Sequence, residues 1–219
     1  MVALVIAYFL SERGGMYLNV TNRCTNNCVF CFRNIGGRLY QDLKLKKEPS
    51  ARQVLEDIGR HSLLHVPEIV FCGVGEPLLR LDDVVIPVAR EIKARYGKPL
   101  RINTNGQARL LHPGRDIPGD LRDAGVEKVS ISLNAENHQK YSQLCRPKGN
   151  HLSAEVYDAV LEFTRDCSRR LATEVTALVF PPFALPTRLP GPDIEKVKRI
   201  ASALRVTFRP RPYAGPALL

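Results

Sequence analysis

The sequence has no long hydrophobic run, and this absence argues against a membrane-spanning helix. Its most apolar stretch is Met1–Leu10, which is too short to cross a bilayer. No basic residue precedes this stretch and no cleavage-site pattern follows it, so it does not read as a secretory signal. We expect Val2–Phe9 to form a buried first strand in a cytoplasmic protein that does not associate with membranes.

Acidic residues are also in the minority. The chain has 22 Asp and Glu against 32 Lys and Arg, which gives a formal net charge of +10. Such a charge favours anionic partners, and nucleic acid is the obvious one. The basic residues recur in almost every segment, however, and no patch interleaves them with aromatic residues. A solvated basic surface therefore explains the charge equally well, and both interpretations stay open.

Internal repeats and low-complexity segments are absent as well. The 219 residues are 44% hydrophobic and 25% charged, as is ordinary for a globular protein with a sizeable core. We therefore expect one domain over residues 1–219.

Strand-like and helix-like stretches alternate along this domain. After the first strands, expected strands lie at Glu68–Cys72, Leu100–Asn103, Val126–Leu133, Glu174–Phe180 and Val206–Phe208. Expected helices start at Ser50 and at Asp82 or Asp83, lie near Leu121, and span Ala154–Arg170 and Ile194–Leu204, whereas Phe32–Pro49 reads as a long loop. Alternation of this kind implies parallel pairing with right-handed crossovers. About six units are too few for an eight-unit barrel, so we predict an α/β fold with a partial, open (β/α)6 TIM-like barrel.

Three cysteines lie close together in the segment 21–33, directly after a short strand. Cys24, Cys28 and Cys31 are spaced so that one loop can direct three sulfurs at a common centre. Thiolates suit zinc, copper(I) or iron–sulfur clusters. No fourth cysteine lies nearby, and no second Cys-x-x-Cys pair completes a closed zinc site. Three ligands therefore favour a four-iron cluster with one open iron over a structural zinc loop.

Other motifs also follow expected strands, at the edge where β/α barrels carry their reactive groups. They are Gly73-Val74-Gly75-Glu76-Pro77, Thr104-Asn105-Gly106 and Ser132-Leu133-Asn134. Glycine lets backbone approach a ligand closely, but Leu78 stands where a dinucleotide fingerprint needs its third glycine. Asparagine and serine can hydrogen-bond a ligand, and they also favour plain turns.

With these motifs the sequence resembles the radical SAM superfamily, whose signature is Cys-x-x-x-Cys-x-aromatic-Cys. Phe30 fills the aromatic position. The wider text is similar to the TatD-associated radical SAM proteins. The matching pieces are Tyr-Leu-Asn-Val-Thr-Asn-Arg-Cys-Thr-Asn, Phe-Cys-Gly-Val-Gly-Glu-Pro-Leu, Arg-Ile-Asn-Thr-Asn-Gly-Gln and Ile-Ser-Leu-Asn-Ala, in the expected order.

The resemblance implies a [4Fe-4S] cluster held by Cys24, Cys28 and Cys31, and S-adenosylmethionine (SAM) as the second cofactor. It implies reductive cleavage of SAM to a 5′-deoxyadenosyl radical that abstracts hydrogen from an unknown substrate. It places SAM contacts at Phe30, Gly73, Gly75, Glu76, Pro77, Asn105, Ser132 and Asn134. It also implies an electron donor such as flavodoxin or ferredoxin, and a functional link to TatD-type nucleases.

Two alternatives stay open beside this interpretation. One is a radical SAM enzyme that modifies RNA, because Gly-Val-Gly-Glu-Pro also resembles a stretch of the rRNA-methylating branch. The other is a non-catalytic iron–sulfur module, which would hold a cluster without binding SAM.

Three further cysteines and one proline-rich segment complete the candidates. Cys72 and Cys145 are weak candidates for a hydrogen-atom donor or nucleophile, since free cysteines are commonly small buried residues. Cys167, on an expected helix, should be core. The segment 181–192 is rich in proline and is a candidate flap.

Overall fold

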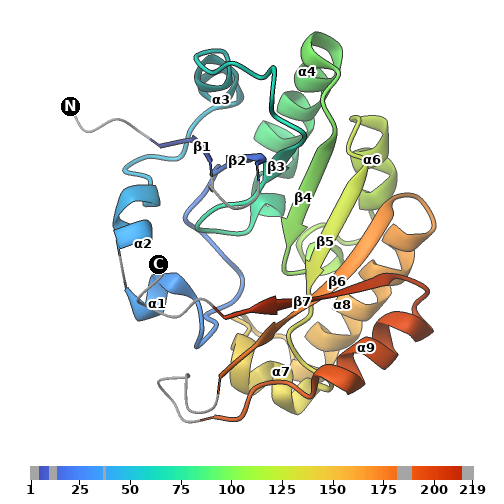
Figure 1. Cartoon of the computed structure of the whole chain (residues 1–219). Helices are drawn as coiled ribbons and strands as arrows, with labels where there is room; N and C mark the ends of the chain where they lie inside the picture. Colours follow the sequence, from blue (N-terminus) through green and yellow to red (C-terminus); the bar gives the residue numbers. More distant parts are fainter. Residues whose placement is uncertain (1–4, 10–13, 37, 182–188, 214–219) are drawn as a thin grey trace.

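One curved sheet of seven strands organises the molecule, and Figure 1 shows it in a computed structural model that describes residues 5–9, 14–36, 38–181 and 189–213. The strands lie in sequence order. They are β1 (Ala7–Phe9), β2 (Met16–Leu18), β3 (Ile69–Phe71), β4 (Leu100–Thr104), β5 (Lys128–Ser132), β6 (Ala172–Val179) and β7 (Thr207–Pro212). β1 is antiparallel to β2, and every later pair is parallel.

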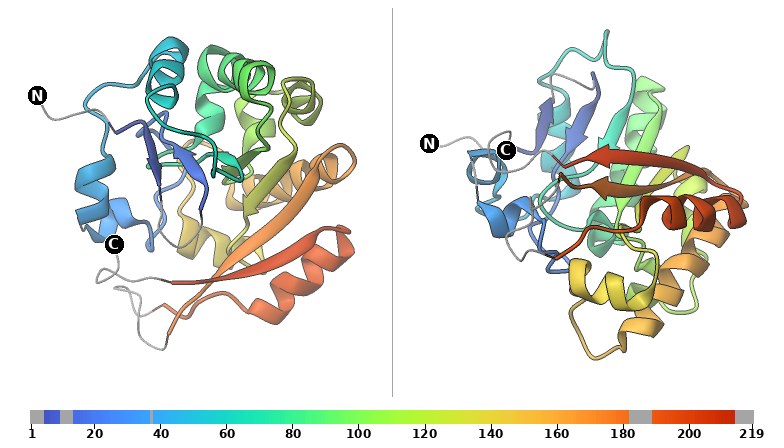
Figure 2. Two further views of the ribbon diagram at one scale, coloured as in Figure 1. Left: turned by 45° about the horizontal axis from the view of Figure 1, so that its top comes forward. Right: turned by 60° about the horizontal axis from the view of Figure 1, so that its bottom comes forward.

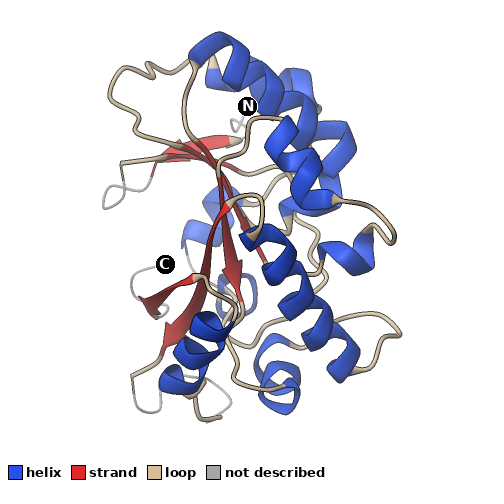
Figure 3. Cartoon of the chain, turned by 90° about the vertical axis from the view of Figure 1, so that its right-hand side faces the viewer, coloured by secondary structure: helices blue, strands red, loops and turns tan. Residues whose placement is uncertain are grey.

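Helices connect the parallel strands and gather mainly on one face of the sheet (Figure 3). They are α1 (Phe32–Ile35), α2 (Arg38–Leu43), α3 (Ala51–Ile58), η1 (Pro77–Arg80), η2 (Leu81–Val85), α4 (Ile86–Tyr96), α5 (Ala108–Leu111), α6 (Ile117–Asp123), α7 (His138–Cys145), α8 (Ser153–Ser168) and α9 (Ile194–Ala203). In the described part of the chain β1 and β7 do not pair with each other, so the barrel is open (Figure 2). The predicted partial barrel is confirmed.

Alternation along the strands separates an apolar face from a charged one. Ile102, Val129 and Val175 are fully buried in the core cluster that packs under the helices. Their neighbours along the strands are charged and pair across the sheet: Arg101 binds Glu68 at 2.6 Å, and Lys128 and Arg209 both bind Glu174, at 3.0 and 2.5 Å. These pairs lie near the amino ends of their strands, where they fill the bottom of the barrel.

The sequence predicts a long loop over Phe32–Pro49, and this prediction is wrong. The segment contains the short helices α1 and α2. Neither is long enough to show an amphipathic period. Side chains of the preceding strand-loop hold the segment instead: Asn19 Nδ2 donates to the Leu43 carbonyl at 2.5 Å, and Asn22 Nδ2 donates to the Leu45 carbonyl at 2.6 Å. Tertiary hydrogen bonds therefore stabilise structure that local sequence does not predict.

Two helix starts show what local signals predict well and poorly. Ser50 caps α3 in a capping box with Gln53, as its position predicts. The helix expected to begin at Asp82 or Asp83 begins earlier, because the Glu76 carboxylate accepts from the Leu78 amide and starts η1 at Pro77. η1 then runs through η2 into α4, which ends at Gly97 in the left-handed region.

Three expected segments end differently or fall partly outside the described residues. The strand expected to end at Phe208 continues to Pro212, because an edge strand tolerates proline. In the flap candidate 181–192, positions 182–188 lie outside the described residues, as do positions 2–4 of the expected first strand. Within the described ranges, no helix is long and apolar enough to cross a membrane.

Candidate active site

The cysteine loop follows β2 and meets the turns that follow β3 and β4. The Glu76 amide donates to the Arg23 carbonyl at 2.8 Å, which joins the Gly73–Pro77 turn to the loop. Asn105, after β4, donates from Nδ2 to Thr25 Oγ1 at 2.7 Å and to Cys24 Sγ at 3.7 Å. The structure therefore brings the cysteine motif together with the turns after β3 and β4 at the carboxyl edge of the sheet.

Gly73 and Gly75 both lie directly against other protein atoms, with no space for a side chain. A Cβ atom at Gly73 would collide with the Asn19 side chain, and one at Gly75 would collide with the Arg23 carbonyl and lie 2.6 Å from the Thr21 carbonyl. Real Cβ atoms do not approach other atoms this closely. A side chain at Gly75 would therefore displace the cysteine loop itself.

The Glu76 side chain is buried and fully engaged inside the protein. Its carboxylate accepts from Thr104 Oγ1 at 2.8 Å, from the Asn105 amide at 2.7 Å and from the Leu78 amide at 3.1 Å. Burial raises the pKa of Glu76 to about 7, although these three hydrogen bonds oppose the shift. Glu76 thus fixes the turn after β3 to the end of β4.

A buried polar network that no sequence motif predicts holds the loop from the other side. Tyr141 Oη accepts from Asn26 Nδ2 and Gln107 Nε2, both at 3.1 Å, and Gln107 Nε2 also donates to Asn26 Oδ1 at 2.7 Å. The loop backbone continues the contact, since the Val29 amide donates to the Leu144 carbonyl at 2.9 Å and the Asn27 amide to the Cys145 carbonyl at 3.1 Å. The carboxyl end of α7 therefore clamps the cysteine loop.

The other predicted SAM contacts lie on neighbouring turns. Asn134 has a φ of 54° and accepts from the Leu178 amide at 3.1 Å through Oδ1. Ser132 is half-buried, and no hydrogen bond within the described residues engages its hydroxyl. Phe30 packs on Phe180 with ring centroids 5.7 Å apart, and Phe180 packs on Tyr213 at 4.9 Å. An aromatic row thus extends from the cysteine loop past the end of β6.

The three remaining cysteines lie in different surroundings. Cys145 is buried beneath the loop, where its thiol raises the pKa of Cys28. Cys72 is half-buried, and its carbonyl accepts from Tyr8 Oη at 3.1 Å. Cys167 is fully buried in the core, as predicted.

The donor chemistry of the loop fits an iron–sulfur cluster. Burial raises the pKa of Cys24 to about 11, and the contact with Cys145 raises that of Cys28, while the charge of Arg33 opposes both shifts. Cluster binding would release these protons. Among the described residues no three His, Cys, Asp or Glu side chains converge as ligands of one metal ion would. In a four-iron cluster each cysteine binds a different iron, so its ligands need not converge on one point.

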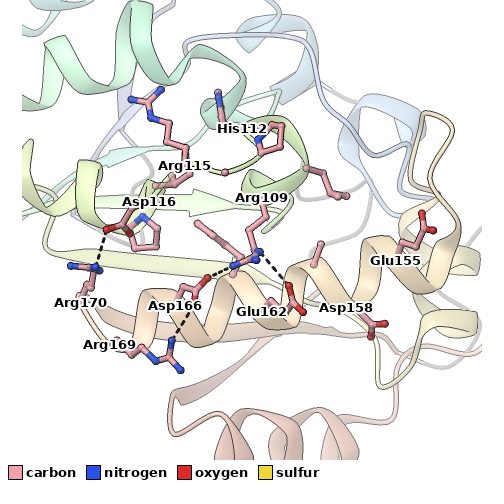
Figure 4. Close-up of a pocket in the computed structure, with 17 residues that line it drawn as sticks. Arg109, His112, Arg115, Asp116, Glu155, Asp158, Glu162, Asp166, Arg169 and Arg170 are labelled. Atoms are coloured by element: carbon pink, nitrogen blue, oxygen red, sulfur yellow. Dashed lines mark hydrogen bonds and ion pairs between the residues drawn. The ribbon is translucent and has the colours of Figure 1, made fainter.

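A pocket lies away from this edge, between the α5–α6 segment and α8 (Figure 4). Its volume is about 830 Å³. Ion pairs span its walls: Arg109 binds Asp166 at 2.5 Å, and Arg170 binds Asp116 at 2.8 Å. None of the predicted site residues lines it, so the cysteine edge is the candidate active site.

An open (β/α)6 barrel with three thiols on the loop after its first parallel strand defines the class of barrel enzymes that carry an iron–sulfur cluster at the strand ends. Residues 18–182 match the radical SAM superfamily, and the chain belongs to that family. It is a radical SAM enzyme, and its cofactors are a [4Fe-4S] cluster and SAM. The alternative of a non-catalytic module is thereby set aside.

Curated relatives and solved structures agree with this assignment. A probable GTP 3′,8-cyclase from Methanothermobacter marburgensis is 34% identical over 59% of this chain and 38% of its own length. A GTP 3′,8-cyclase from Clostridium botulinum is 32% identical over 59% of this chain and 37% of its own. The chain thus spans well under half the length of these relatives.

The solved structures support the fold alone. Methylornithine synthase has a TM-score of 0.61 at 14% identity, covering 92% of this chain and 55% of the other. Streptococcus suis SuiB bound to S-adenosylmethionine has a TM-score of 0.62 at 14% identity, covering 93% of this chain and 43% of the other.

Proposed function

We propose that Cys24, Cys28 and Cys31 bind the [4Fe-4S] cluster and that the enzyme abstracts hydrogen from its substrate. The bound cofactors supply one-electron reductive cleavage of SAM to methionine and a 5′-deoxyadenosyl radical. The observation that supports the proposal is the loop itself, which carries three half-buried thiols and is held by contacts from the turns after β3 and β4 and from α7. The protein residues hold the cluster, orient SAM and limit the access of water.

We choose among the predicted SAM contacts by asking which polar side chains already have protein partners. The side chains of Glu76 and Asn105 already form hydrogen bonds to the turn after β4 and to the cysteine loop. We therefore assign them to positioning the loop, and the polar contacts of SAM to the Ser132 hydroxyl and the backbone of Gly73–Pro77. Phe30 lies in the aromatic row and offers a ring face for the adenine. Asn134 holds the end of β6 beside it.

Anaerobic reconstitution tests the cluster and its use separately. Wild-type protein should bind about four irons with a Mössbauer spectrum of a [4Fe-4S] cluster, and with dithionite and SAM it should form 5′-deoxyadenosine. The Cys24→Ala, Cys28→Ala, Cys31→Ala triple variant should bind no cluster. Full iron content in the triple variant would show that these three cysteines are not the cluster ligands. An intact, reducible cluster without SAM cleavage would instead contradict the proposed reaction.

An acidic one-electron carrier, flavodoxin or ferredoxin, fits as the electron donor because basic residues surround the cysteine loop. Residues 22–52 contain seven Lys and Arg but only two Asp and Glu. Lys44, Lys46 and Lys47 are exposed, and no carboxylate of the described residues pairs with them. Lys44 lies 5.8 Å from the Tyr40 ring, which lies 6.1 Å from the Phe32 ring next to Cys31. A carrier on this surface would approach the cluster closely.

Comparing two reductants isolates this docking step. The Lys44→Glu, Lys46→Glu, Lys47→Glu variant should keep its dithionite-driven SAM cleavage but lose roughly tenfold or more in flavodoxin-driven rate at low salt. A matched reversal at Arg165, Lys198 and Arg199, on the far helices α8 and α9 (Figure 1), should keep both rates. An equal loss of flavodoxin-driven rate in the two variants would show that only the net charge matters, and would contradict docking at this surface.

For the substrate, a guanine nucleotide is the first candidate. It rests on the GTP 3′,8-cyclases, to which this chain is 32–34% identical over 59% of its length. The competing candidate is a nucleic acid, which the +10 charge and the resemblance to TatD-associated proteins favour. The link to a TatD-type nuclease belongs with that second candidate.

Stimulation of SAM cleavage separates the two substrate classes. GTP should raise 5′-deoxyadenosine formation above the substrate-free rate, and mass spectrometry should find a changed nucleotide. Stimulation by mixed RNA or single-stranded DNA, falling steeply with salt, would favour the nucleic-acid candidate instead. ATP serves as the control for a general effect of triphosphates.

A further inference from the structure

The side chain of Arg33 is joined to the cysteine loop by hydrogen bonds. It lies in α1, two residues after Cys31, and its guanidinium makes three hydrogen bonds. Nη1 donates to the Asn22 carbonyl at 3.2 Å, Nη2 to the Asn26 carbonyl at 2.9 Å, and Nε to Cys31 Sγ at 3.4 Å. The two carbonyls flank Cys24, so one side chain joins both ends of the cysteine motif.

The partners of Arg33 differ from those of neighbouring arginines. Arg23 pairs with Glu48 at 2.9 Å, and the buried Arg80 pairs with Glu48 and Asp83. Arg33 has no carboxylate partner among the described residues, and the ionisable groups that act on it are the thiols of Cys31, Cys24 and Cys28. Within the described part of the chain no carboxylate neutralises its charge, which acts on the sulfurs instead.

We propose that Arg33 is a positioning residue of the cysteine loop whose charge also raises the reduction potential of the cluster. This inference rests on the proposed function, since it concerns the same cluster. A one-electron reduction adds one negative charge to the cluster, and a nearby cation stabilises the reduced form more than the oxidised one. Hydrogen bonds to the cluster sulfurs and local charge are recognised determinants of this potential. A purely structural Arg33 would hold the carbonyls without changing the potential.

Two substitutions separate the charge from the hydrogen bonds. Arg33→Gln keeps two N–H donors and removes the charge, so its cluster should be harder to reduce, with a roughly tenfold smaller equilibrium constant for reduction, which is about 59 mV for one electron. Arg33→Lys keeps the charge and loses the fork, so its potential should stay near that of the wild type, with somewhat lower iron content. Arg23→Gln is the matched control, because its guanidinium faces Glu48, and should not change the potential.

The measurement is a redox titration of the reconstituted proteins followed by electron paramagnetic resonance, together with iron content and circular dichroism of each variant. A Gln variant with an intact cluster and the wild-type potential would overturn the proposal. So would equal lowering in the Gln and Lys variants, or equal loss of the cluster from both. If the wild type itself binds no cluster, the proposed function fails first.

Discussion

At Gly75 the turn after β3 packs so closely against the cysteine loop that only the hydrogen of a glycine fits between them. The Gly75→Ala variant should lose about 1–3 kcal/mol of unfolding free energy, as overpacking does, because the Arg23 carbonyl must move. Iron content after reconstitution should fall with it, since Arg23 precedes Cys24. Urea unfolding and iron analysis measure the two effects.

Gly59→Ala is the matched control for this prediction. Gly59 has an ordinary φ of −64°, and its added Cβ would lie 3.4 Å from the nearest atom, the Leu55 carbonyl oxygen. Its stability and iron content should stay close to those of the wild type. Full iron content in Gly75→Ala would show that the loop does not depend on this contact.

The hydroxyl of Tyr141 accepts two of the buried hydrogen bonds that hold the cysteine loop. Tyr141→Phe leaves the Asn26 and Gln107 amides without their shared acceptor in a buried place, which costs about 1–3 kcal/mol. Tyr157→Phe removes a hydroxyl with one hydrogen bond, to the Ala135 carbonyl at 3.3 Å, and should cost about 0.5–1.5 kcal/mol. Equal losses in urea unfolding of the two variants would contradict the network's role.

At the scale of elements, the parts that sequence predicts are those that local spacing encodes. The alternation of strands and helices predicts the open barrel, and a few neighbouring residues suffice to predict the cysteine motif and the Ser50 cap. The hydrogen bonds between α7 and the cysteine loop cannot be predicted in this way, because Asn26 and Tyr141 lie 115 positions apart. Polar residues with no period acquire their roles only when the fold brings them together.

The same limit explains the charged bottom of the barrel, where β5, β6 and β7 meet at Glu174. Burial alone would raise the pKa of Glu174, but hydrogen bonds from Arg209, Ser130 and Lys128 outweigh it and lower the pKa to about 2. The unfolded chain binds this proton near the usual pKa of 4.5. The stability that Glu174 contributes is therefore present above pH 4.5 and is lost as the pH falls from there towards 2.

Glu174→Gln should flatten the acid side of the stability curve. It removes the carboxylate that two cations share, so it should also cost on the order of 1–3 kcal/mol at neutral pH. Urea midpoints between pH 3 and 7 would show both effects. Glu195→Gln, which removes an exposed carboxylate of α9 with no ion pair in the described structure, should keep the wild-type slope. An unchanged slope in Glu174→Gln would contradict the argument.

At the scale of the whole molecule, an open barrel leaves two sheet edges that invite pairing with other chains. β1 is only three residues long, and its outward Ala7 amide donates to Asp57 Oδ2 at 2.9 Å. At the other edge, the Tyr213 amide donates to the Val179 carbonyl at 3.0 Å. Because alternate residues face the neighbouring strand, Pro210 and Pro212 occupy positions whose amides would face away from β6. Proline has no N–H to offer there.

The Pro210→Val, Pro212→Val variant should therefore associate where the wild type does not. It restores two outward N–H groups on a strand whose described part pairs only with β6, and it adds β-branched side chains that favour strands. We expect its elution in size-exclusion chromatography to shift to larger size with rising protein concentration. Thr207→Val, on the same strand, adds a β-branched apolar residue without adding an N–H and should elute as the wild type does. If the double-proline variant also elutes like the wild type at every concentration, the prolines do not protect this edge.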